Sequence, residues 1–317
     1  MKNILVIGAA GQIGSELVPE LRARGYMTVA AGSGRTPLPE HLTDGPTATV
    51  NLLDHDALDA VIKHFNIDTV FNLAAILSAV GESKPMAAWN LGVNGVIGLL
   101  ELARDRKLSV FTPSSIGVFG PETPHDLTPQ DTVCRPRTMY GITKVAGELL
   151  SDYYRAKYGV DARSVRYPGL ISYVTPPGGG TTDYAVDIYW KAIEKGVYRC
   201  PLKAGTYLPM MFMPDALRAA IELMEADASR LKHFNSFNVG ALSFDPEEVA
   251  ASIQKRLPGF KLEYDVNPLL QSIADSWPDD LDDTAAREEW NWVPKYNLDQ
   301  MTNVMLDAIT KRVTESV

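Results

Sequence analysis

The stretch that most constrains the fold of this chain is its first fourteen residues, which read MKNILVIGAAGQIG. Residues 4–7 form an apolar run with β-branched side chains, which is typical of a strand buried on both faces of a sheet. A glycine-rich turn follows directly, and from residue 12 apolar side chains recur at helical spacing until Gly25. The sequence therefore predicts a strand that leads through a tight turn into a helix.

Three glycines, Gly8, Gly11 and Gly14, are evenly spaced in this turn. In a dinucleotide-binding fold the first allows the tight turn, the second lets the backbone approach a pyrophosphate, and the third lets the helix pack against the strand. The positive end of the helix then faces the phosphates. Glycine turns also occur for purely conformational reasons. The strand before the glycines and the helix after them favour a dinucleotide site over that alternative.

Composition and charge narrow the class of partner. With 317 residues, 45% of them hydrophobic, the chain has enough apolar material for a globular core. The 30 basic and 39 acidic residues give a net charge of −9, which argues against nucleic acid or an anionic membrane and favours a small-molecule partner. The sequence has no 18-residue apolar run and no signal-peptide pattern, so we expect a cytoplasmic protein.

Cysteine and histidine usage predicts neither disulfide bonds nor a metal site. Cys134 and Cys200 are too few for a disulfide framework or a zinc ligand set, and the five histidines are scattered without metal-ligand spacing. We therefore expect a protein without a metal.

Strand and helix patterns alternate through the first half of the chain, which predicts an α/β fold with a doubly wound parallel sheet of the Rossmann type. Residues 175–183, rich in proline, glycine and threonine, interrupt the alternation and are expected to form a functional loop. We predict a nucleotide-binding domain at residues 1–170 and a smaller, interleaved α/β substrate domain at residues 171–317, with segments returning to the Rossmann sheet. The later predicted strands are 26–31, 47–52, 68–73, 108–112, 161–167, 237–239 and 261–264, and the later predicted helices are 54–65, 85–107, 138–158, 183–195, 214–226, 246–256 and 298–313.

Tyr140 and Lys144 lie four residues apart in the predicted helix 138–158, so their side chains share one helical face. A neighbouring ammonium favours a phenolate, which would let Tyr140 act as a general base. Most pairs with this spacing are only a solvated tyrosine and a surface lysine. Ser115 favours the catalytic interpretation because it follows the predicted strand 108–112, at the sheet edge where open α/β sheets bind ligands.

These three residues, the glycine turn and the Asn72-Leu73-Ala74-Ala75 stretch resemble the extended short-chain dehydrogenase/reductase family across nearly the whole chain. The resemblance implies that the serine orients the substrate oxygen, the tyrosine transfers its proton, and the lysine binds the nicotinamide ribose. Ser114 is expected to be a hydrogen-bonding residue at the strand end. The residues expected to contact the cofactor are Gly8, Gly11, Gln12, Ile13, Gly14, Ser33, Arg35, Asn51, Leu52, Leu73, Ala74, Ala75, Pro113, Tyr140, Lys144 and Tyr167.

Longer stretches narrow the resemblance to the short-chain type of L-threonine 3-dehydrogenase within that family. They are residues 77–79, 113–116, 166–172, 176–185, 208–211 and 274–278. The implied reaction is the oxidation of L-threonine to 2-amino-3-ketobutyrate with hydride transfer to a nicotinamide cofactor. The resemblance also implies a homodimer built from helices 85–107 and 138–158. The expected substrate contacts are Ser78, Ser115, Tyr140, Gly180, Thr181, Thr182, Asp183 and Trp277.

Two of these substrate contacts have structural alternatives. The hydroxyls and carboxylate of residues 181–183 suit a zwitterionic amino acid, but Asp183 could equally cap the helix that follows. Trp277 could form an apolar wall around the threonine methyl group, or it could simply be part of the core.

The sequence departs from the family pattern at two positions. The family usually has an acid at the end of the second strand to bind the adenosine ribose, whereas this chain reads Gly32-Ser33-Gly34-Arg35 there. The missing acid and the nearby Arg35 are compatible with a 2′-phosphate, so the resemblance favours NAD while NADP stays open. The second departure is Gly92, which stands where the family has a helix asparagine near the nicotinamide.

Two other functions stay open. A nucleotide-sugar 4-epimerase or dehydratase would use the same fold and the same three catalytic residues, but it needs a larger pocket. A non-catalytic dinucleotide-binding regulator would have no need of a proton-transferring tyrosine. Residues 181–183 and 274–278 favour the threonine dehydrogenase over the epimerase, and the intact Ser115, Tyr140 and Lys144 set favours an enzyme over a regulator.

Overall fold

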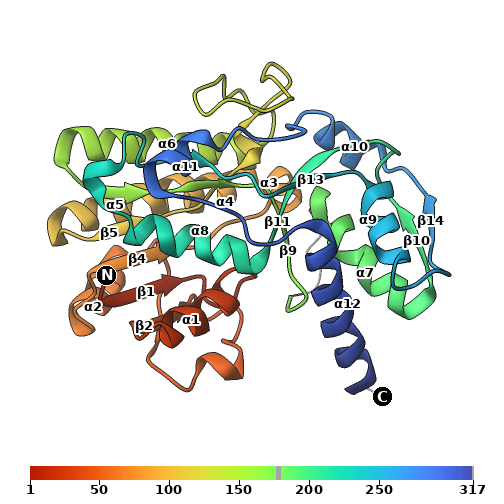
Figure 1. Cartoon of the computed structure of the whole chain (residues 1–317). Coiled ribbons are helices and arrows are strands. Elements are labelled where there is room, and N and C mark those ends of the chain that lie inside the picture. The colour runs from red at the N-terminus through yellow and green to blue at the C-terminus, as the bar shows by residue number, and fades with distance from the viewer. Residues whose placement is uncertain (176–179, 316–317) are drawn as a thin grey trace.

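The computed structural model describes residues 1–175 and 180–315, and its main element is a parallel six-stranded sheet with strand order β3-β2-β1-β4-β5-β7 (Figure 1). This confirms the predicted α/β fold of the Rossmann type. The strands of this sheet are β1 (Asn3–Ile7), β2 (Met27–Gly32), β3 (Thr47–Thr49), β4 (Thr69–Asn72), β5 (Ser109–Phe111) and β7 (Asp161–Arg163). The α-helices are α1 (Gly14–Ala23), α2 (His55–His64), α3 (Ser78–Ser83), α4 (Pro85–Trp89), α5 (Gly95–Arg106), α6 (Met139–Tyr158), α7 (Tyr184–Lys195), α8 (Met213–Glu225), α9 (Pro246–Gln254), α10 (Pro268–Ala274), α11 (Thr284–Trp290) and α12 (Leu298–Glu315).

Alternate side chains of β1 face two different layers of helices. Ile4 and Val6 are buried in a core cluster with residues of α1 and α8, whereas Leu5 and Ile7 are buried in a cluster with residues of α2 and α5. The strand is therefore covered on both faces, which explains why residues 4–7 are continuously apolar.

The predicted strand 161–167 is wrong as a single strand, because it is divided at Ser164. β7 stays beside β5 in the main sheet, whereas β8 (Val165–Tyr167) lies between β6 (Ser114–Ser115) and β12 (Phe237–Asn238) in a separate sheet. At the break, Ser164 Oγ donates to Asn235 Oδ1 at 2.5 Å and accepts from the N–H of Ser236 at 2.8 Å. These bonds hold the segment that leads into β12.

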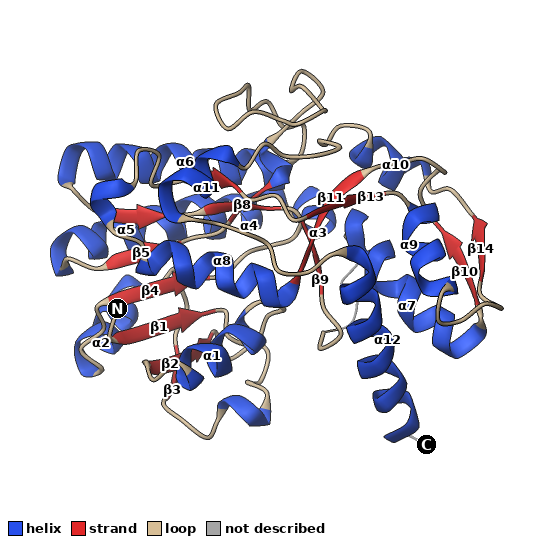
Figure 2. Cartoon of the chain, viewed as in Figure 1, coloured by secondary structure: helices blue, strands red, loops and turns tan. Residues whose placement is uncertain are grey.

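In the C-terminal half, α7, α9, α10 and α12 belong to a smaller group of elements beside the main sheet, whereas α8 and α11 pack on the core of the main sheet (Figure 2). The predicted helices of this half are present as α7, α8, α9 and α12. Residues 176–179 of the predicted loop lie outside the described residues, and Thr181–Asp183 forms a single 3-10 turn. The division of the chain at residue 170 stays a prediction. The strands here are β9 (Gly169–Ile171), β11 (Leu208–Phe212) and β13 (Leu242–Phe244) in one sheet and β10 (Val197–Cys200) and β14 (Lys261–Tyr264) in another.

The predicted helix 85–107 is continuous, but its middle is not α-helical. A π-helical segment at Asn90–Asn94 joins α4 to α5. Gly92 lies in this segment, and a Cβ there would come within 2.9 Å of Thr143 Cβ on α6. Glycine at this position therefore allows the two helices to approach closely. The helix Pro85–Arg106 is long and apolar enough to cross a membrane, because 18 consecutive residues of it have a mean hydropathy of 1.3. However, 44% of these residues are buried inside the protein, as in the core helix of a globular protein.

Candidate active site

The glycine turn has the backbone geometry of a phosphate-binding loop. Gly8 has a left-handed φ of +82°, and a Cβ there would lie 3.0 Å from backbone atoms of Leu73 and Ala74. A Cβ at Gly14 would overlap the carbonyl oxygen of Gly8, so only glycine lets α1 approach the turn this closely. The first turn of α1 has no side-chain cap from Ile13, which leaves backbone N–H groups for an anion.

A cleft of about 510 Å³ begins at this turn, where the strand order reverses on either side of β1. This switch point is where doubly wound sheets bind their ligands. The predicted cofactor residues that line the cleft are Gly8, Gly11, Ser33, Arg35, Asn51, Leu52, Leu73, Ala74 and Ala75. The cleft is also lined by residues that were not among the predicted cofactor contacts, namely Thr36, Leu53, Ile76, Ala87, Asn90 and Leu91.

A second pocket, of about 290 Å³, shares the glycine turn with the cleft. A dinucleotide seated on the turn would therefore reach from the cleft into this pocket. The side chain of Ser78, a predicted substrate contact, lies outside the described residues. The predicted residues that line the second pocket are Gly8, Gly11, Gln12, Ile13, Gly14, Leu73, Ala75, Pro113, Ser115, Tyr140, Lys144, Tyr167, Gly180, Thr181, Thr182, Asp183 and Trp277, and they are joined by Leu77, Ser114, Pro168, Gly169 and Leu170.

Tyr140 and Lys144 lie in the first two turns of α6. Thr138 caps this helix by accepting from the N–H of Gly141 at 3.1 Å. Lys144 Nζ lies 5.5 Å from the centre of the Tyr140 ring and donates to the carbonyl oxygen of Pro113 at 2.6 Å. Because an ammonium has three donors, this bond leaves Lys144 able to bind another acceptor such as a ribose hydroxyl. The structure thus brings the two side chains together as their spacing predicts.

Ser115 lies on β6 beside the same helix. Its Oγ accepts from the N–H of Gly117 at 3.1 Å, so its own O–H is available to donate. Gly117 lies against Tyr140, because a Cβ at this glycine would be 3.1 Å from two carbons of the tyrosine ring. Ser115 and Tyr140 therefore belong to one wall of the pocket.

The residues expected to bind substrate also have structural contacts. Asp183, which also lines the pocket, accepts at Oδ2 from the N–H of Gly180 at 2.8 Å. This bond caps the 3-10 turn Thr181–Asp183 and not the helix α7 that follows, so the predicted capping of that helix is wrong. Trp277 is part of the C-terminal core as well as the pocket wall. Thr181 is buried, and among the described residues its Oγ1 has no hydrogen-bond partner. A bound ligand could satisfy that hydroxyl.

Tyr167 contributes its ring rather than its hydroxyl to the pocket. The hydroxyl donates to the carbonyl oxygen of Ala216 at 2.6 Å, and burial raises the pKa of this phenol. A direct hydrogen bond from Tyr167 to the cofactor would have to replace this contact.

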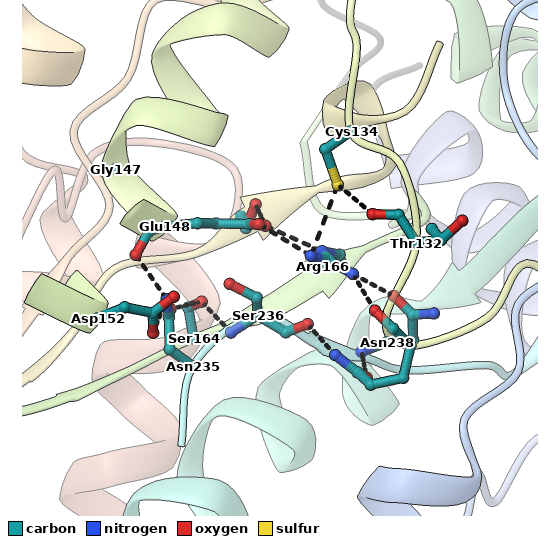
Figure 3. Close-up of polar contacts among 12 residues, drawn as sticks. Thr132, Cys134, Gly147, Glu148, Asp152, Ser164, Arg166, Asn235, Ser236 and Asn238 are labelled. Atoms are coloured by element: carbon teal, nitrogen blue, oxygen red, sulfur yellow. Dashed lines mark hydrogen bonds and ion pairs between the residues drawn. The ribbon is translucent and has the colours of Figure 1, made fainter. Parts of the chain in front are cut away.

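The sequence analysis missed two charged residues directly behind the pocket. Ser114 Oγ donates to Glu148 Oε1 at 2.5 Å. Glu148 in turn forms an ion pair with Arg166 (Figure 3). The hydrogen-bonding role predicted for Ser114 is therefore present. The only sequence signal for Glu148 is its spacing, four residues after Lys144 on the same helical face.

Within residues 1–175 and 180–315 no three His, Cys, Asp or Glu side chains are close enough together to hold a metal ion. The glycine turn and the strand ends line both pockets, and the Ser115, Tyr140 and Lys144 side chains line the second pocket.

The chain is similar to known proteins over most of its length. Residues 4–240 match the NAD dependent epimerase/dehydratase family. An uncharacterised epimerase/dehydratase of Staphylococcus saprophyticus is 51% identical over 98% of this chain and 97% of its own length. The structure of an L-threonine dehydrogenase from Clostridium difficile is similar with a TM-score of 0.96, at 50% identity over 98% of each chain. The holo form of a GalE-like L-threonine dehydrogenase from Cupriavidus necator has a TM-score of 0.92, at 47% identity over 96% of this chain and 99% of that one.

These likenesses support an oxidoreductase of the short-chain dehydrogenase/reductase type that uses a nicotinamide dinucleotide. The sequence motifs, the sheet topology and the family match agree over most of the chain. The chain therefore belongs to the NAD dependent epimerase/dehydratase family, within the extended short-chain dehydrogenases/reductases that its sequence resembles.

Proposed function

We propose that this protein oxidises the β-hydroxyl of L-threonine to 2-amino-3-ketobutyrate, with a nicotinamide dinucleotide and without a metal. The observation that carries the proposal is the convergence of Ser115, Tyr140 and Lys144 on a pocket that residues 180–183 and Trp277 also line. The similarity to solved L-threonine dehydrogenases at 50% and 47% identity supports the same substrate.

The residues of the glycine turn fit a dinucleotide. The closely packed glycines and the N-terminus of α1, which has no side-chain cap, would hold the pyrophosphate, and Lys144 would hold the nicotinamide ribose. When bound, the dinucleotide supplies the acceptor for the hydride that leaves the β-carbon.

The side chains of the pocket then divide the work on the substrate hydroxyl. Ser115 donates its O–H to the substrate oxygen and holds it in place. Tyr140, as phenolate, takes the hydroxyl proton while the carbon–oxygen double bond forms. Lys144 supplies a positive charge on the same helical face, which favours the phenolate.

The remaining walls of the pocket suit a small amino acid. Leu77 and Trp277 offer an apolar surface to the methyl group, and the buried Thr181 hydroxyl offers a hydrogen bond to a polar end. Residues 180–183 and Trp277, which favour L-threonine over the substrate of an epimerase in the sequence, all line this pocket.

The proposal is tested by incubating the protein with L-threonine and either NAD or NADP and following the absorbance of the reduced nicotinamide. We expect reduction with L-threonine and an unchanged rate after treatment with a chelator. A parallel incubation with UDP-glucose tests the epimerase alternative. Epimerisation of the sugar without oxidation of threonine would overturn the proposal, and inhibition by the chelator that added zinc reverses would reveal a metal site.

Arg35 is expected to decide the choice between NAD and NADP. It lines the cofactor cleft at the end of β2, where no carboxylate stands to repel a 2′-phosphate. A charge-assisted bond to that phosphate contributes about 1.5–3 kcal/mol, so Arg35→Ala should weaken NADP binding roughly tenfold or more and spare NAD. Ser33→Asp should give a clear preference for NAD. Equal losses for both cofactors, measured as Kd by fluorescence titration, would show that Arg35 does not read the phosphate.

We also propose that two copies of the chain pair through the long helices, as the family resemblance implies. Apolar side chains on the outer faces of α4, α5 and α6 are exposed, among them Met86, Trp89, Ile97, Ile142 and Leu149. A second copy related by a twofold axis would cover this surface with the same residues.

Leu149→Glu is expected to weaken the dimer about tenfold or more, because it places a charge among these apolar side chains. The measurement is sedimentation velocity over a range of protein concentrations. Leu269→Glu is the matched control, since Leu269 on α10 is 68% exposed and Leu149 is 64% exposed. A wild-type protein that is fully active as a monomer at micromolar concentration would contradict the dimer.

The cytoplasmic location and the lack of a nucleic-acid or membrane partner stay predictions from composition.

A further inference from the structure

Three side chains recur at every fourth position along one face of α6: Tyr140, Lys144 and Glu148. The last two bind consecutive residues of the chain that leads to Ser115. Lys144 Nζ donates to the carbonyl oxygen of Pro113 at 2.6 Å, and Ser114 Oγ donates to Glu148 Oε1 at 2.5 Å. The helix that carries Tyr140 is thus fixed to the strand that carries Ser115 by two adjacent hydrogen bonds.

Arg166 holds the Glu148 carboxylate in place from the other side. Its Nε and Nη2 donate to the two carboxylate oxygens at 3.0 and 2.9 Å, and both side chains are buried. Arg166 Nη1 donates to the carbonyl oxygen of Gln130 at 2.9 Å and to Asn238 Oδ1 at 3.2 Å, so Arg166 lies between Glu148 and Asn238 (Figure 3). Ser114 pairs with Arg166 in register between β6 and β8. Strand, helix and guanidinium therefore fix one another's positions.

Stability alone does not explain an ion pair at this place. A buried pair is often no more stable than apolar side chains of similar volume. A bidentate contact does, however, fix geometry more tightly than apolar packing does. The pair lies one helical turn beyond Lys144, where geometry matters for the proposed reaction.

The charge of the pair also matters for the active site. Without a partner, the negative charge of Glu148 would weaken the effect of the positive charge of Lys144 on Tyr140. The positive charge of Arg166 compensates the charge of Glu148. Burial would lower the pKa of Arg166, but Glu148 more than offsets this and holds it above its ordinary value. The other titratable groups near this pair are Asp152 on α6, Cys134 and Asp131 before α6, and His233 after α8.

We propose that Glu148 and Arg166 are positioning residues, which keep Ser115 and Tyr140 aligned and leave Lys144 as the uncompensated charge beside Tyr140. This inference rests on the proposed function. It assigns these residues no contact with substrate or cofactor.

The alignment is tested with Ser114→Ala, which removes one hydrogen bond and no charge. Because small misplacements of reacting groups cost large factors in rate, we expect kcat to fall roughly tenfold to a hundredfold, with KM for L-threonine nearly unchanged. Ser151→Ala is the matched control, since Ser151 is also buried on α6, and its Oγ donates to the carbonyl oxygen of Gly147 in its own helix and to no other described group. A kcat for Ser114→Ala no lower than that of the control would overturn the alignment.

The charge is tested with Glu148→Gln, which leaves the Arg166 cation uncompensated two helical turns from Tyr140. That cation favours the phenolate, so the midpoint of the acidic limb of the pH–rate profile should move about one pH unit lower. The double variant Glu148→Gln/Arg166→Gln should return the midpoint to the wild-type position. A purely structural pair would lower kcat in both variants without moving the midpoint.

Direct titration of Tyr140 keeps this test independent of turnover. Tyrosinate absorbance of each variant, with cofactor bound, is compared with that of the same variant carrying Tyr140→Phe. We expect the same shift as in the rate profile. Absence of the shift would overturn the proposed charge compensation, whereas a wild-type protein that does not oxidise L-threonine would overturn the proposed function instead.

Discussion

Replacing Tyr140 by phenylalanine is expected to lower kcat for L-threonine oxidation by at least about 100-fold, the usual effect of removing a general acid or base. The variant keeps the ring and loses only the phenolic oxygen that takes the substrate proton. Its KM and its thermal stability should change little, because the ring still packs against Gly117. Steady-state kinetics with saturating cofactor gives the measurement.

The same helix supplies the control for this prediction. Tyr153 and Lys157 form a second tyrosine–lysine pair with identical spacing, and Lys157 Nζ donates to Tyr153 Oη at 2.7 Å. That hydrogen bond lowers the pKa of Tyr153, yet the pair lies on the exposed side of α6, away from both pockets. Tyr153→Phe should therefore leave kcat within about twofold of wild type. Equal losses in the two variants would contradict the role assigned to Tyr140.

Asp215→Ala is expected to lower the free energy of unfolding by about 3–5 kcal/mol, the range for breaking a buried ion pair. Asp215 is fully buried at the start of α8. Its carboxylate accepts from Arg218 Nη1 at 2.8 Å, from the N–H of Lys295 at 2.9 Å and from the N–H of Tyr296 at 3.1 Å. Alanine would leave all three donors without this acceptor, so the connection from α11 to α12 would lose the hydrogen bonds of Lys295 and Tyr296 to α8.

Chemical denaturation measures this loss of stability. The control is a second ion pair of Arg218, the one with Glu222. Arg218 Nε donates to Glu222 Oε1 at 2.9 Å, on the partly exposed side of α8. Glu222→Gln should cost no more than about 1 kcal/mol, because a solvated ion pair contributes little. A similar small loss for Asp215→Ala would show that the buried carboxylate is not what holds residues 295–296 to α8.

Some parts of the fold and the site could be predicted because a local sequence pattern determines their structure. Asp54, the first residue of the predicted helix 54–65, accepts from the N–H of Ala57 at 3.0 Å at the start of α2. Tyr140 and Lys144 share a face because any α-helix places residues four apart on the same side. Ser115 lies beside them because the carboxyl ends of parallel strands meet at one edge of the sheet.

Two of the strands missing from the sequence-based predictions, β9 and β11, contain residues that usually argue against a strand. β11 includes Pro209, which lacks an N–H for the ladder. Pro209 lies opposite Ser243 of β13, and the pairing with β9 begins only at Met210, so the ladder with β9 requires no N–H from Pro209. β9 begins at Gly169, where a Cβ would come too close to Thr182 and Met210, and this close approach is visible only in the folded protein.

The polar contacts behind the pocket could not be predicted for a different reason. Glu148 and Arg166 come from a helix and a strand, and their pairing depends on the register between β8 and β6. The sequence analysis treated residues 161–167 as one strand, so the shift to a second sheet at Ser164 could not be anticipated. The face of the strand on which Arg166 lies can be assigned only when this break is known.

The pairing of β8 with β12 determines when the strand that carries Arg166 is completed during synthesis on the ribosome. Val165 pairs with Phe237, which is made roughly 70 residues later. At about 5–20 residues per second, this edge of β8 waits roughly 4–14 s for its partner. An unpaired strand edge invites association with other chains. We therefore expect nascent chains that end before residue 238 to be those most dependent on chaperones, and Arg166 to acquire its rigid setting only after most of the protein has been made.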